Sequence, residues 1–227
     1  MYKRQKVGAV ILAAGESKRM GGMDKMWALL KAKPVLARVL GVFVNCTEID
    51  QIVIVLNKKN LKKGRQLKKE LGTAKPITLC IGGAHRQDSV EAGLAKLKNC
   101  NWVVIQDGAR PLVTSQLIEQ GLDAAKEKGA AIAAIPVTDT IKIVKGNRIK
   151  QTVPRHVLWA AQTPQVFRYD IITEAYDQIT SNVTDDASLV EQIGYKVTVY
   201  AGSPDNIKIT TPDDLIIAEC LLKKYDK

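Results

Sequence analysis

Short apolar runs alternate along the chain with amphipathic segments. The runs are rich in Val, Ile and Ala and apolar throughout, which is typical of strands that are buried on both faces. Strands are predicted at 7–13, 51–56, 77–80, 102–106, 130–137 and 196–200, and helices at 35–46, 61–71, 86–97, 115–128 and 212–224. This alternation predicts an α/β fold, a Rossmann-like, doubly wound and mostly parallel sheet, with ligands beyond the carboxyl ends of its strands.

One stretch, 138–156, interrupts this alternation. Two short β patterns, Thr140–Val144 and Arg148–Val153, flank the sequence Lys145-Gly146-Asn147. Gly and Asn tolerate the positive φ angles of a tight turn, so the stretch is predicted to form a protruding β-hairpin. An isolated hairpin is only marginally stable in water. We therefore expect a single domain over residues 1–227, with an arm that packs on something such as a second subunit.

The composition narrows what the chain binds. An excess of Lys and Arg gives a net charge of +11, which indicates anionic partners without choosing between nucleic acid and small phosphates. Much of that excess lies in Lys58–Lys69, where a solvated helix face is a simpler explanation than a nucleic-acid groove. Aromatic residues are scarce, and no apolar run approaches the roughly 20 residues of a membrane span. We expect neither nucleic acid nor a membrane as a partner.

The N-terminus and the cysteines indicate a cytoplasmic protein. Lys3, Arg4 and Lys6 precede an apolar run, as in a signal peptide, but this run is short and leads into a Gly-rich loop instead of a cleavage site. The run is therefore predicted to be the first strand. The four cysteines form no C-x-x-C pair, and three of them lie in apolar segments. That placement favours buried, reduced thiols over a disulfide framework.

The loop after the first predicted strand is a candidate phosphate-binding site. It reads Ala13-Ala14-Gly15-Glu16-Ser17-Lys18-Arg19-Met20-Gly21-Gly22 and is followed by Lys25. Small residues let the backbone approach a phosphate chain, and consecutive N–H groups can form an anion-binding nest. The P-loop and dinucleotide-binding patterns are both absent. Taken alone, the loop is explained equally well as an ordinary strand–helix turn.

The segment Gly82–Val90 follows the third predicted strand and opens a helix. Two glycines before a helix N-terminus can hold a planar base against the backbone, and Arg86 can reach phosphate or ribose. Ser89 is either a hydroxyl partner for a base edge or a helix cap. The segment is thus a candidate nucleoside site.

Two acidic segments follow later strands. Asp107 stands at a strand tip beside a glycine, where a carboxylate can hold Mg²⁺ that bridges phosphates, although a plain Asp107–Arg110 pair is the rival interpretation. Thr211 is predicted to cap the last helix, with proline at its first position. Asp205 and Lys208 lie just before that cap, where a second metal carboxylate and a lysine would fit.

Together these segments resemble the 2-C-methyl-D-erythritol 4-phosphate cytidylyltransferases of non-mevalonate isoprene biosynthesis, over essentially the whole chain. Two departures lie in the first loop. Ser17 stands where the family usually has glycine, and Gly22–Trp27 is shorter and lacks the usual proline before the lysine. Each motif alone is weak, but seven in the right order are specific. They are Ala13–Met20 with Lys25, Gly82–Val90, Asp107–Pro111, Pro136–Lys142, Leu158–Gln165, Thr184–Ser188 and Asp205–Thr210.

The resemblance implies a transferase that joins CTP to 2-C-methyl-D-erythritol 4-phosphate, giving 4-diphosphocytidyl-2-C-methyl-D-erythritol and pyrophosphate, with Mg²⁺ or another divalent cation as cofactor. It also implies a homodimer whose arm reaches into the partner's site. The implied catalytic residues are Arg19, Lys25 and Lys208, and the nucleotide-binding residues are Ala13, Ala14, Gly15, Gly82, Gly83, Arg86, Ser89 and Asp107. The implied polyol phosphate-binding residues are Arg110, Thr140, Arg155, Thr163 and Thr184, and the metal ligands are Asp107 and Asp205.

Such a reaction needs no general base. The second pKa of a phosphate monoester lies near 6, so the acceptor is already mostly a dianion at neutral pH. The protein's task is then to position two polyanions and to neutralise the charge that builds on the transferred group and the leaving group.

Two alternatives remain at this point. A cytidylyltransferase for another acceptor, such as ribitol 5-phosphate, would share the nucleotide loops and differ around Thr140, Arg155 and Thr163. A non-enzymatic module that senses nucleotides or binds nucleic acid would use the basic surface and release no pyrophosphate.

Overall fold

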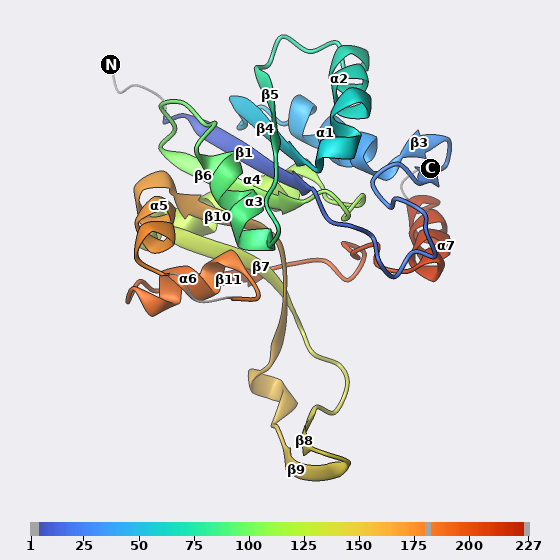
Figure 1. Ribbon diagram of the computed structural model, residues 1–227. Coiled ribbons are helices and arrows are strands. Elements are labelled where there is room, and N and C mark those ends of the chain that lie inside the picture. The colour runs from blue at the N-terminus through green and yellow to red at the C-terminus, as the bar shows by residue number, and fades with distance from the viewer. Residues whose placement is uncertain (1–4, 180–182, 225–227) are drawn as a thin grey trace.

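The computed structural model describes residues 5–179 and 183–224. Its centre is a seven-stranded sheet with the strand order β11-β7-β10-β6-β1-β4-β5 (Figure 1). Neighbouring strands run parallel, except that β10 is antiparallel to both β6 and β7. The predicted α/β fold with a mostly parallel sheet is thus confirmed. The strands are β1 (Val7–Ala13), β4 (Gln51–Leu56), β5 (Ile77–Ile81), β6 (Trp102–Asp107), β7 (Ala130–Pro136), β10 (Trp159–Arg168) and β11 (Thr198–Ala201).

Strand β10 is the main element that the apolar pattern did not predict. It lies in the middle of the sheet, yet Gln162, Thr163 and Gln165 are buried polar residues within it. Each of them makes hydrogen bonds, so burial leaves none of the three side chains wholly without partners. Because these polar side chains interrupt the apolar run, periodicity alone did not indicate a strand here.

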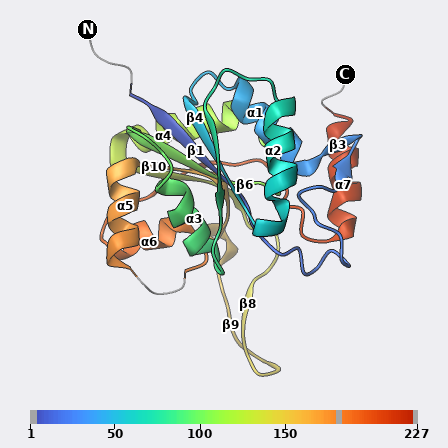
Figure 2. The same ribbon diagram turned by 45° about the horizontal axis from the view of Figure 1, so that its top comes forward.

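Helices cover both faces of the sheet (Figure 2). Along β1, Ala9 and Ile11 pack into the core beneath one helical layer, whereas Val10 and Leu12 pack into the core beneath the other. This alternation is what a strand buried on both faces requires. The first layer contains α1 (Val35–Asn45), α2 (Leu61–Glu70) and α4 (Ser115–Lys128), and the second contains α3 (Arg86–Leu94), α5 (Tyr169–Gln178) and α6 (Asp186–Gln192). Helices α5 and α6 were not predicted.

The C-terminal helix α7 (Pro212–Leu222) begins as predicted. Thr211 is its N-cap, Pro212 occupies the first turn, and the Asp214 carboxylate accepts hydrogen bonds from the backbone N–H groups of Thr210 and Thr211 at 2.7 and 2.8 Å. Such a capping box fixes the helix start. The helix contacts β2 (Leu29–Leu30), which pairs with β3 (Lys33–Pro34) in a small hairpin. The segment that carries Lys208 is therefore held by a rigid helix start.

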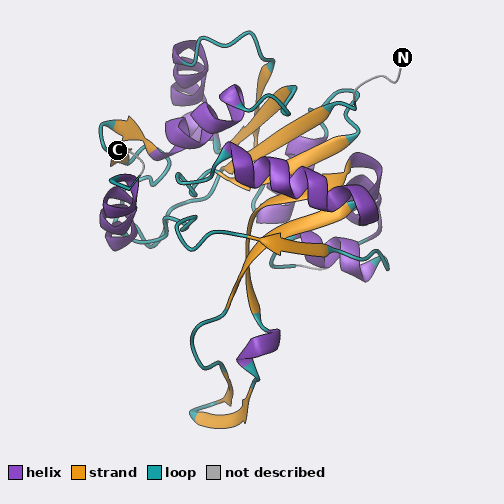
Figure 3. Ribbon diagram, turned by 180° about the vertical axis from the view of Figure 1, so that it is seen from behind, coloured by secondary structure: helices purple, strands orange, loops and turns teal. Residues whose placement is uncertain are grey.

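The predicted arm protrudes from the body of the molecule (Figures 1 and 3). Its strands, β8 (Lys142–Lys145) and β9 (Arg148–Thr152), are shorter than predicted, and all their residues are exposed. Gly146 takes the positive φ of the turn, at 58°, while Asn147 does not. A short 3-10 turn, η2 (Arg155–Val157), leads back towards β10. No helix in the part of the chain that the structure describes is long and apolar enough to cross a membrane.

The unpredicted strand carries one of the largest side chains of the core, Phe167, which is fully buried. We expect Phe167→Ala to lower the free energy of unfolding by about 3–5 kcal/mol, because it removes buried apolar surface and leaves a cavity. Urea-induced unfolding followed by circular dichroism measures this change. Val199→Ala, at an exposed position on β11, is the control and is expected to change the free energy of unfolding by less than about 1 kcal/mol. Equal effects of the two substitutions would contradict the central placement of β10.

Candidate active site

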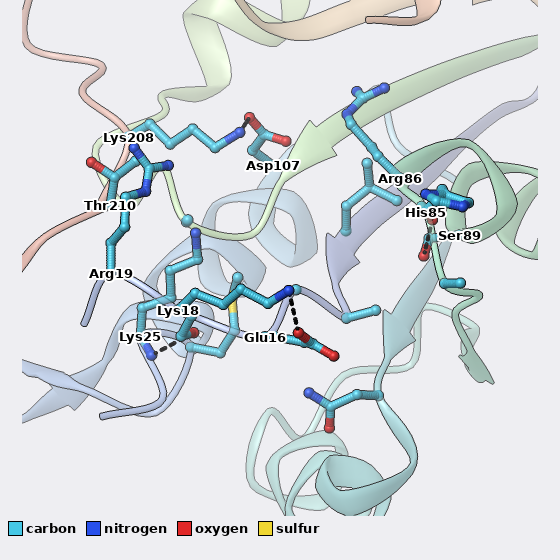
Figure 4. Close-up of a pocket in the computed structure, with 18 of the residues that line it drawn as sticks. Glu16, Lys18, Arg19, Lys25, His85, Arg86, Ser89, Asp107, Lys208 and Thr210 are labelled. Atoms are coloured by element: carbon cyan, nitrogen blue, oxygen red, sulfur yellow. Dashed lines mark hydrogen bonds and ion pairs between the residues drawn. The ribbon is translucent and has the colours of Figure 1, made fainter. Parts of the chain in front are cut away.

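A pocket of about 610 Å³ opens at the carboxyl edge of the sheet, where the predicted fold places its ligands. The loops after β1, β5 and β6 contribute to it, together with the segment before α7 (Figure 4). Nine of the predicted site residues line this pocket, although they come from four separate segments. They are Ala14, Gly15, Arg19, Lys25, Gly83, Arg86, Ser89, Asp107 and Lys208.

Asp107 is the one carboxylate among these nine. It ends β6 and is buried, and its Oδ2 lies 2.8 Å from Lys208 Nζ and 3.5 Å from Arg110 Nε. Its backbone N–H donates to Thr163 Oγ1 at 3.1 Å. Burial alone would raise the pKa of Asp107, but the positive charges of Lys208 and Arg86 outweigh burial and lower it. The carboxylate is therefore ionised at neutral pH.

Lys25 lies across the pocket among other cations. Burial lowers the pKa of Lys25, and the nearby charges of Lys208 and Arg19 lower it further, while Asp107 partly offsets them. The pocket thus has more positive than negative side chains close together. Such a surplus is relieved when a polyanion binds, which suits the pocket to a triphosphate.

The loop after β5, which begins the candidate nucleoside segment Gly82–Val90, packs tightly against the loop after β1. A Cβ on Gly82 would lie 2.6 Å from Ala14 Cβ and 2.5 Å from Ser89 Oγ, so only glycine allows this approach. Gly82 itself does not line the pocket, whereas Gly83 does. Helix α3 then points its N-terminus at the pocket, with the Asp88 carboxylate accepting from His85 N–H at 2.9 Å. Because His85 is the N-cap and Asp88 completes the capping box, Ser89 is not the capping residue.

Arg86 is held by a buried acidic partner that our sequence analysis did not single out. Both carboxylate oxygens of Asp186, which is fully buried on α6, accept from the Arg86 guanidinium at 2.8 and 2.6 Å. Tyr176 donates its hydroxyl to the same carboxylate at 2.7 Å. Although burial opposes the charge on Arg86, its pKa is raised because Asp186 stabilises the charged form. Asp186 lies within a recognised motif, but nothing in the sequence pairs it with Arg86.

A second buried network holds the Lys208 segment against the sheet. Asn206 is fully buried. Its side-chain Nδ2 donates to the backbone carbonyl of Thr163 at 2.8 Å, and its backbone carbonyl accepts from Arg110 Nη1 at 2.7 Å. Ile209 N–H donates to Ala109 O at 2.8 Å. Asn206 therefore links the segment before Lys208 to β10 and to the loop that follows β6. Nothing in the sequence around Asn206 indicated this role, because a polar residue in a short loop is ordinary.

Other predicted site residues lie outside the pocket. Thr163 and Arg110 stand behind Asp107 and contact it from the protein side. Thr140 and Arg155 lie on the exposed arm, where Arg155 Nη1 donates to Thr138 O at 2.8 Å, and Thr184 is exposed before α6. Ala13 is buried at the end of β1.

The metal role predicted for Asp205 is not supported by its position. Its two carboxylate oxygens accept from Lys224 Nζ at 3.0 and 3.2 Å, and it does not line the pocket that contains Asp107. Although Asp205 and Lys208 are close in sequence, their side chains have different partners: Lys224 for Asp205 and Asp107 for Lys208.

Residues 7–224 match the model of the 2-C-methyl-D-erythritol 4-phosphate cytidylyltransferase family. This match covers nearly the whole chain, including every segment of the pocket. The chain belongs to this family. The resemblance seen in the motifs is therefore confirmed.

Individual members of the cytidylyltransferase family are similar over their full lengths. A cytidylyltransferase of this name from Dehalococcoides mccartyi is 52% identical, with 99% of each chain aligned. One from Clostridioides difficile is 44% identical over 94% of this chain and 92% of the relative. Among solved structures, 4-diphosphocytidyl-2C-methyl-D-erythritol synthase from Anaerococcus prevotii superposes with a TM-score of 0.86, at 29% identity, over 96% of this chain and 99% of that one.

The structure explains how this cytidylyltransferase accommodates Ser17, where the family usually has glycine. Ser17 adopts a φ of 56°, the left-handed conformation that glycine takes most easily. Its hydroxyl accepts a hydrogen bond from Lys25 N–H at 3.2 Å. The strained conformation is thus accompanied by a contact that glycine could not make.

The donor set at Asp107 fits a divalent cation only in company with substrate. Within residues 5–179 and 183–224, no group of three or more His, Cys, Asp or Glu side chains could hold a metal ion. Magnesium is commonly bound by one or two carboxylates together with substrate phosphates and water. Asp107 fits that role because its ionised carboxylate lines the pocket beside Lys208.

The Arg86–Asp186 pair predicts a sharp effect on stability. We expect Asp186→Ala to lower the free energy of unfolding by about 3–5 kcal/mol, because it leaves a largely buried guanidinium without its partner. Asp186→Asn keeps the size of the side chain and an acceptor for Tyr176, so it is expected to lower the free energy of unfolding by less than Asp186→Ala does. Thermal unfolding of the three proteins tests the order. A melting temperature for Asp186→Ala equal to that of the unsubstituted chain would refute the role of this pair.

Proposed function

We propose that this chain transfers the cytidylyl group of CTP to 2-C-methyl-D-erythritol 4-phosphate and releases pyrophosphate. The observation that carries the proposal is the gathering of Lys25, Lys208 and Arg19 around the pocket that also contains Asp107. The family match and the names of the similar proteins favour this acceptor over ribitol 5-phosphate. A nucleic-acid-binding module is not favoured, because the cations lie in a pocket lined by nucleotide-binding motifs.

In the proposed reaction, a phosphate oxygen of the acceptor attacks the α-phosphorus of CTP. A new P–O bond forms, the bond between the α-phosphorus and its bridge to the β-phosphate breaks, and pyrophosphate leaves with the electron pair. Because the acceptor phosphate is mostly a dianion at neutral pH, no side chain has to remove a proton. The catalytic task is to align the two phosphates and to stabilise the added negative charge.

The roles of the side chains follow from their positions. Lys25 and Arg19 line the pocket from the first loop and would face the triphosphate, and Lys208 would approach it from the segment before α7, oriented by Asp107. Mg²⁺, held by Asp107 and the phosphates, would neutralise phosphate charge when bound. The backbone around Ala14, Gly15 and Gly83, with Ser89, would bind the nucleotide.

The arm is proposed to complete a homodimer, with Thr140 and Arg155 reaching the acceptor in the partner's site beside Arg110, Thr163 and Thr184. The support is the apolar surface of the arm, where Ile143, Ile149 and Val157 are 44%, 65% and 63% exposed. Isolated hairpins are marginally stable, and exposed apolar patches mark interaction sites. A second subunit would cover this surface.

We also propose a cytoplasmic location. The four cysteines are free, and the reaction consumes a nucleoside triphosphate. Unpaired thiols are typical of a reducing compartment.

The activity is tested by measuring pyrophosphate release with CTP, Mg²⁺ and each acceptor. We expect release with 2-C-methyl-D-erythritol 4-phosphate and little with ribitol 5-phosphate. Lys25→Ala and Lys208→Ala are each expected to lower kcat by about 100-fold or more, because each removes a cation from the transition state. Lys62→Ala, on the exposed surface of α2, is the control and should keep the full rate. Near-normal turnover in both site variants would refute their roles. Salt-sensitive nucleic-acid binding without pyrophosphate release would favour the non-enzymatic alternative.

The dimer is tested by light scattering after size-exclusion chromatography. We expect the unsubstituted chain to elute as a dimer of about twice the 24.9 kDa chain mass. Ile149→Asp places a charge on the apolar face of the arm and is expected to give a monomer with reduced kcat/KM for the acceptor. Val199→Asp introduces the same charge at a comparably exposed apolar position on the body and should leave the dimer intact. A fully active monomer would rule out the arm's role.

A further inference from the structure

The loop that carries Lys25 is tied to the start of α2 by a side-chain hydrogen bond, and Lys63 of α2 also lies over the ring of Trp27, 5.5 Å from its centroid. Asn60 Nδ2 donates to Asp24 Oδ2 at 2.6 Å, and Asn60 is 4% exposed, immediately before α2. The other oxygen of the carboxylate, Asp24 Oδ1, accepts from Met26 N–H at 3.1 Å. The Asp24 carboxylate thus binds Asn60 with one oxygen and Met26 with the other, and Lys25 lies between Asp24 and Met26 in the chain. We call the Asp24–Asn60 contact the clasp.

The surroundings of the clasp make the Lys25 backbone well defined. Lys25 N–H donates to Ser17 Oγ at 3.2 Å, and Asp24 O accepts from the N–H groups of Trp27 and Ala28, each at 3.0 Å. Met26 is buried in the core. These contacts fix the point from which the Lys25 side chain enters the pocket.

Lys25 needs such support for two reasons. Its ammonium shares the pocket with Lys208 and Arg19, and like charges at short range repel one another. The residues that precede it, Gly21 and Gly22, have φ angles of 58° and 89°, and glycine restricts the backbone least. Without an anchor on its far side, the repulsion would move the loop outward.

We propose that Asp24 is a positioning residue for the reaction, which holds Lys25 in the pocket through its hydrogen bond to Asn60. Asp24 does not line the pocket, so it acts through Lys25 and not by touching substrate. The inference rests on the proposed function, in which Lys25 stabilises charge on the triphosphate. It adds a residue, and a partner on α2, to the machinery of that reaction.

The geometry allows the two groups of the clasp to be exchanged. Asn60→Asp sets two carboxylates against each other, and Asp24→Asn leaves one amide oxygen to serve two donors. The double variant Asp24→Asn/Asn60→Asp restores an amide facing a carboxylate. Gln66→Glu is the matched control, because Gln66 Nε2 donates to Glu70 Oε1 at 2.9 Å on the exposed face of the same helix.

We expect Asn60→Asp to lower kcat by tenfold or more and Asp24→Asn by a smaller factor, with the double variant recovering most of the loss. A displacement of about 1 Å at a catalytic group can cost about 100-fold in rate, so kcat should fall more than the KM for CTP rises. Gln66→Glu should keep the full rate. In a Lys25→Ala background, Asp24→Asn should cause no further loss, because it acts through the missing lysine.

The outcomes separate the clasp from the reaction itself. If Lys25→Ala keeps normal turnover, the proposed role of Lys25 fails, and the clasp fails with it. If Lys25→Ala is impaired but the clasp variants have normal kcat, the reaction stands and the clasp is refuted. A rate loss that persists in the Lys25→Ala background, or that the exchange does not repair, shows a merely structural contact and also overturns the proposal. Melting temperatures of all the variants confirm that folded proteins are compared.

Discussion

Repulsion among cations at the carboxyl edge of the sheet is the constraint on which the site depends. Two unit charges about 4 Å apart interact by roughly 4 kcal/mol at the effective dielectric constant of a protein surface. The charges of Lys208 and Arg19 lower the pKa of Lys25, and Asp107 is the acidic group that pairs with Lys208 in the pocket. A protein keeps such an arrangement only if its backbone is held firmly. The same surplus of positive charge favours the binding of two phosphate-bearing molecules.

Arg86 and the segments that carry Lys208 and Lys25 are each held by a polar contact that lies outside the pocket. Asp186 grips Arg86 from α6, Asn206 secures the segment of Lys208, and Asp24 links the loop of Lys25 to α2. These contacts come from elements far apart in the sequence, and the carboxyl ends of neighbouring strands bring them together. The fold thus supplies preorganisation, which is the main requirement for phosphoryl chemistry that needs no general base.

The sequence predicted the parts of this architecture that depend on local pattern. The strand at Val7–Ala13 and the cap at Thr211 follow from apolar runs and from capping chemistry, and both are as predicted. Strand β10 was not predicted, because its buried glutamines and threonine find their hydrogen-bond partners in residues distant in sequence. For the same reason Asp186 and Asn206 were missed as supports, and the pairing of Asp205 with Lys224 was not predicted. Composition and spacing do not record which distant partner a polar group finds.

The most direct test of the electrostatic account is the affinity of the chain for cytidine nucleotides with one, two or three phosphates. Isothermal titration with CMP, CDP and CTP at fixed ionic strength separates the phosphate contribution from that of the nucleoside. The account predicts that affinity rises at least tenfold from CMP to CTP and that Lys208→Ala removes most of this rise. Equal affinity for all three nucleotides, or a rise that Lys208→Ala leaves unchanged, would contradict it.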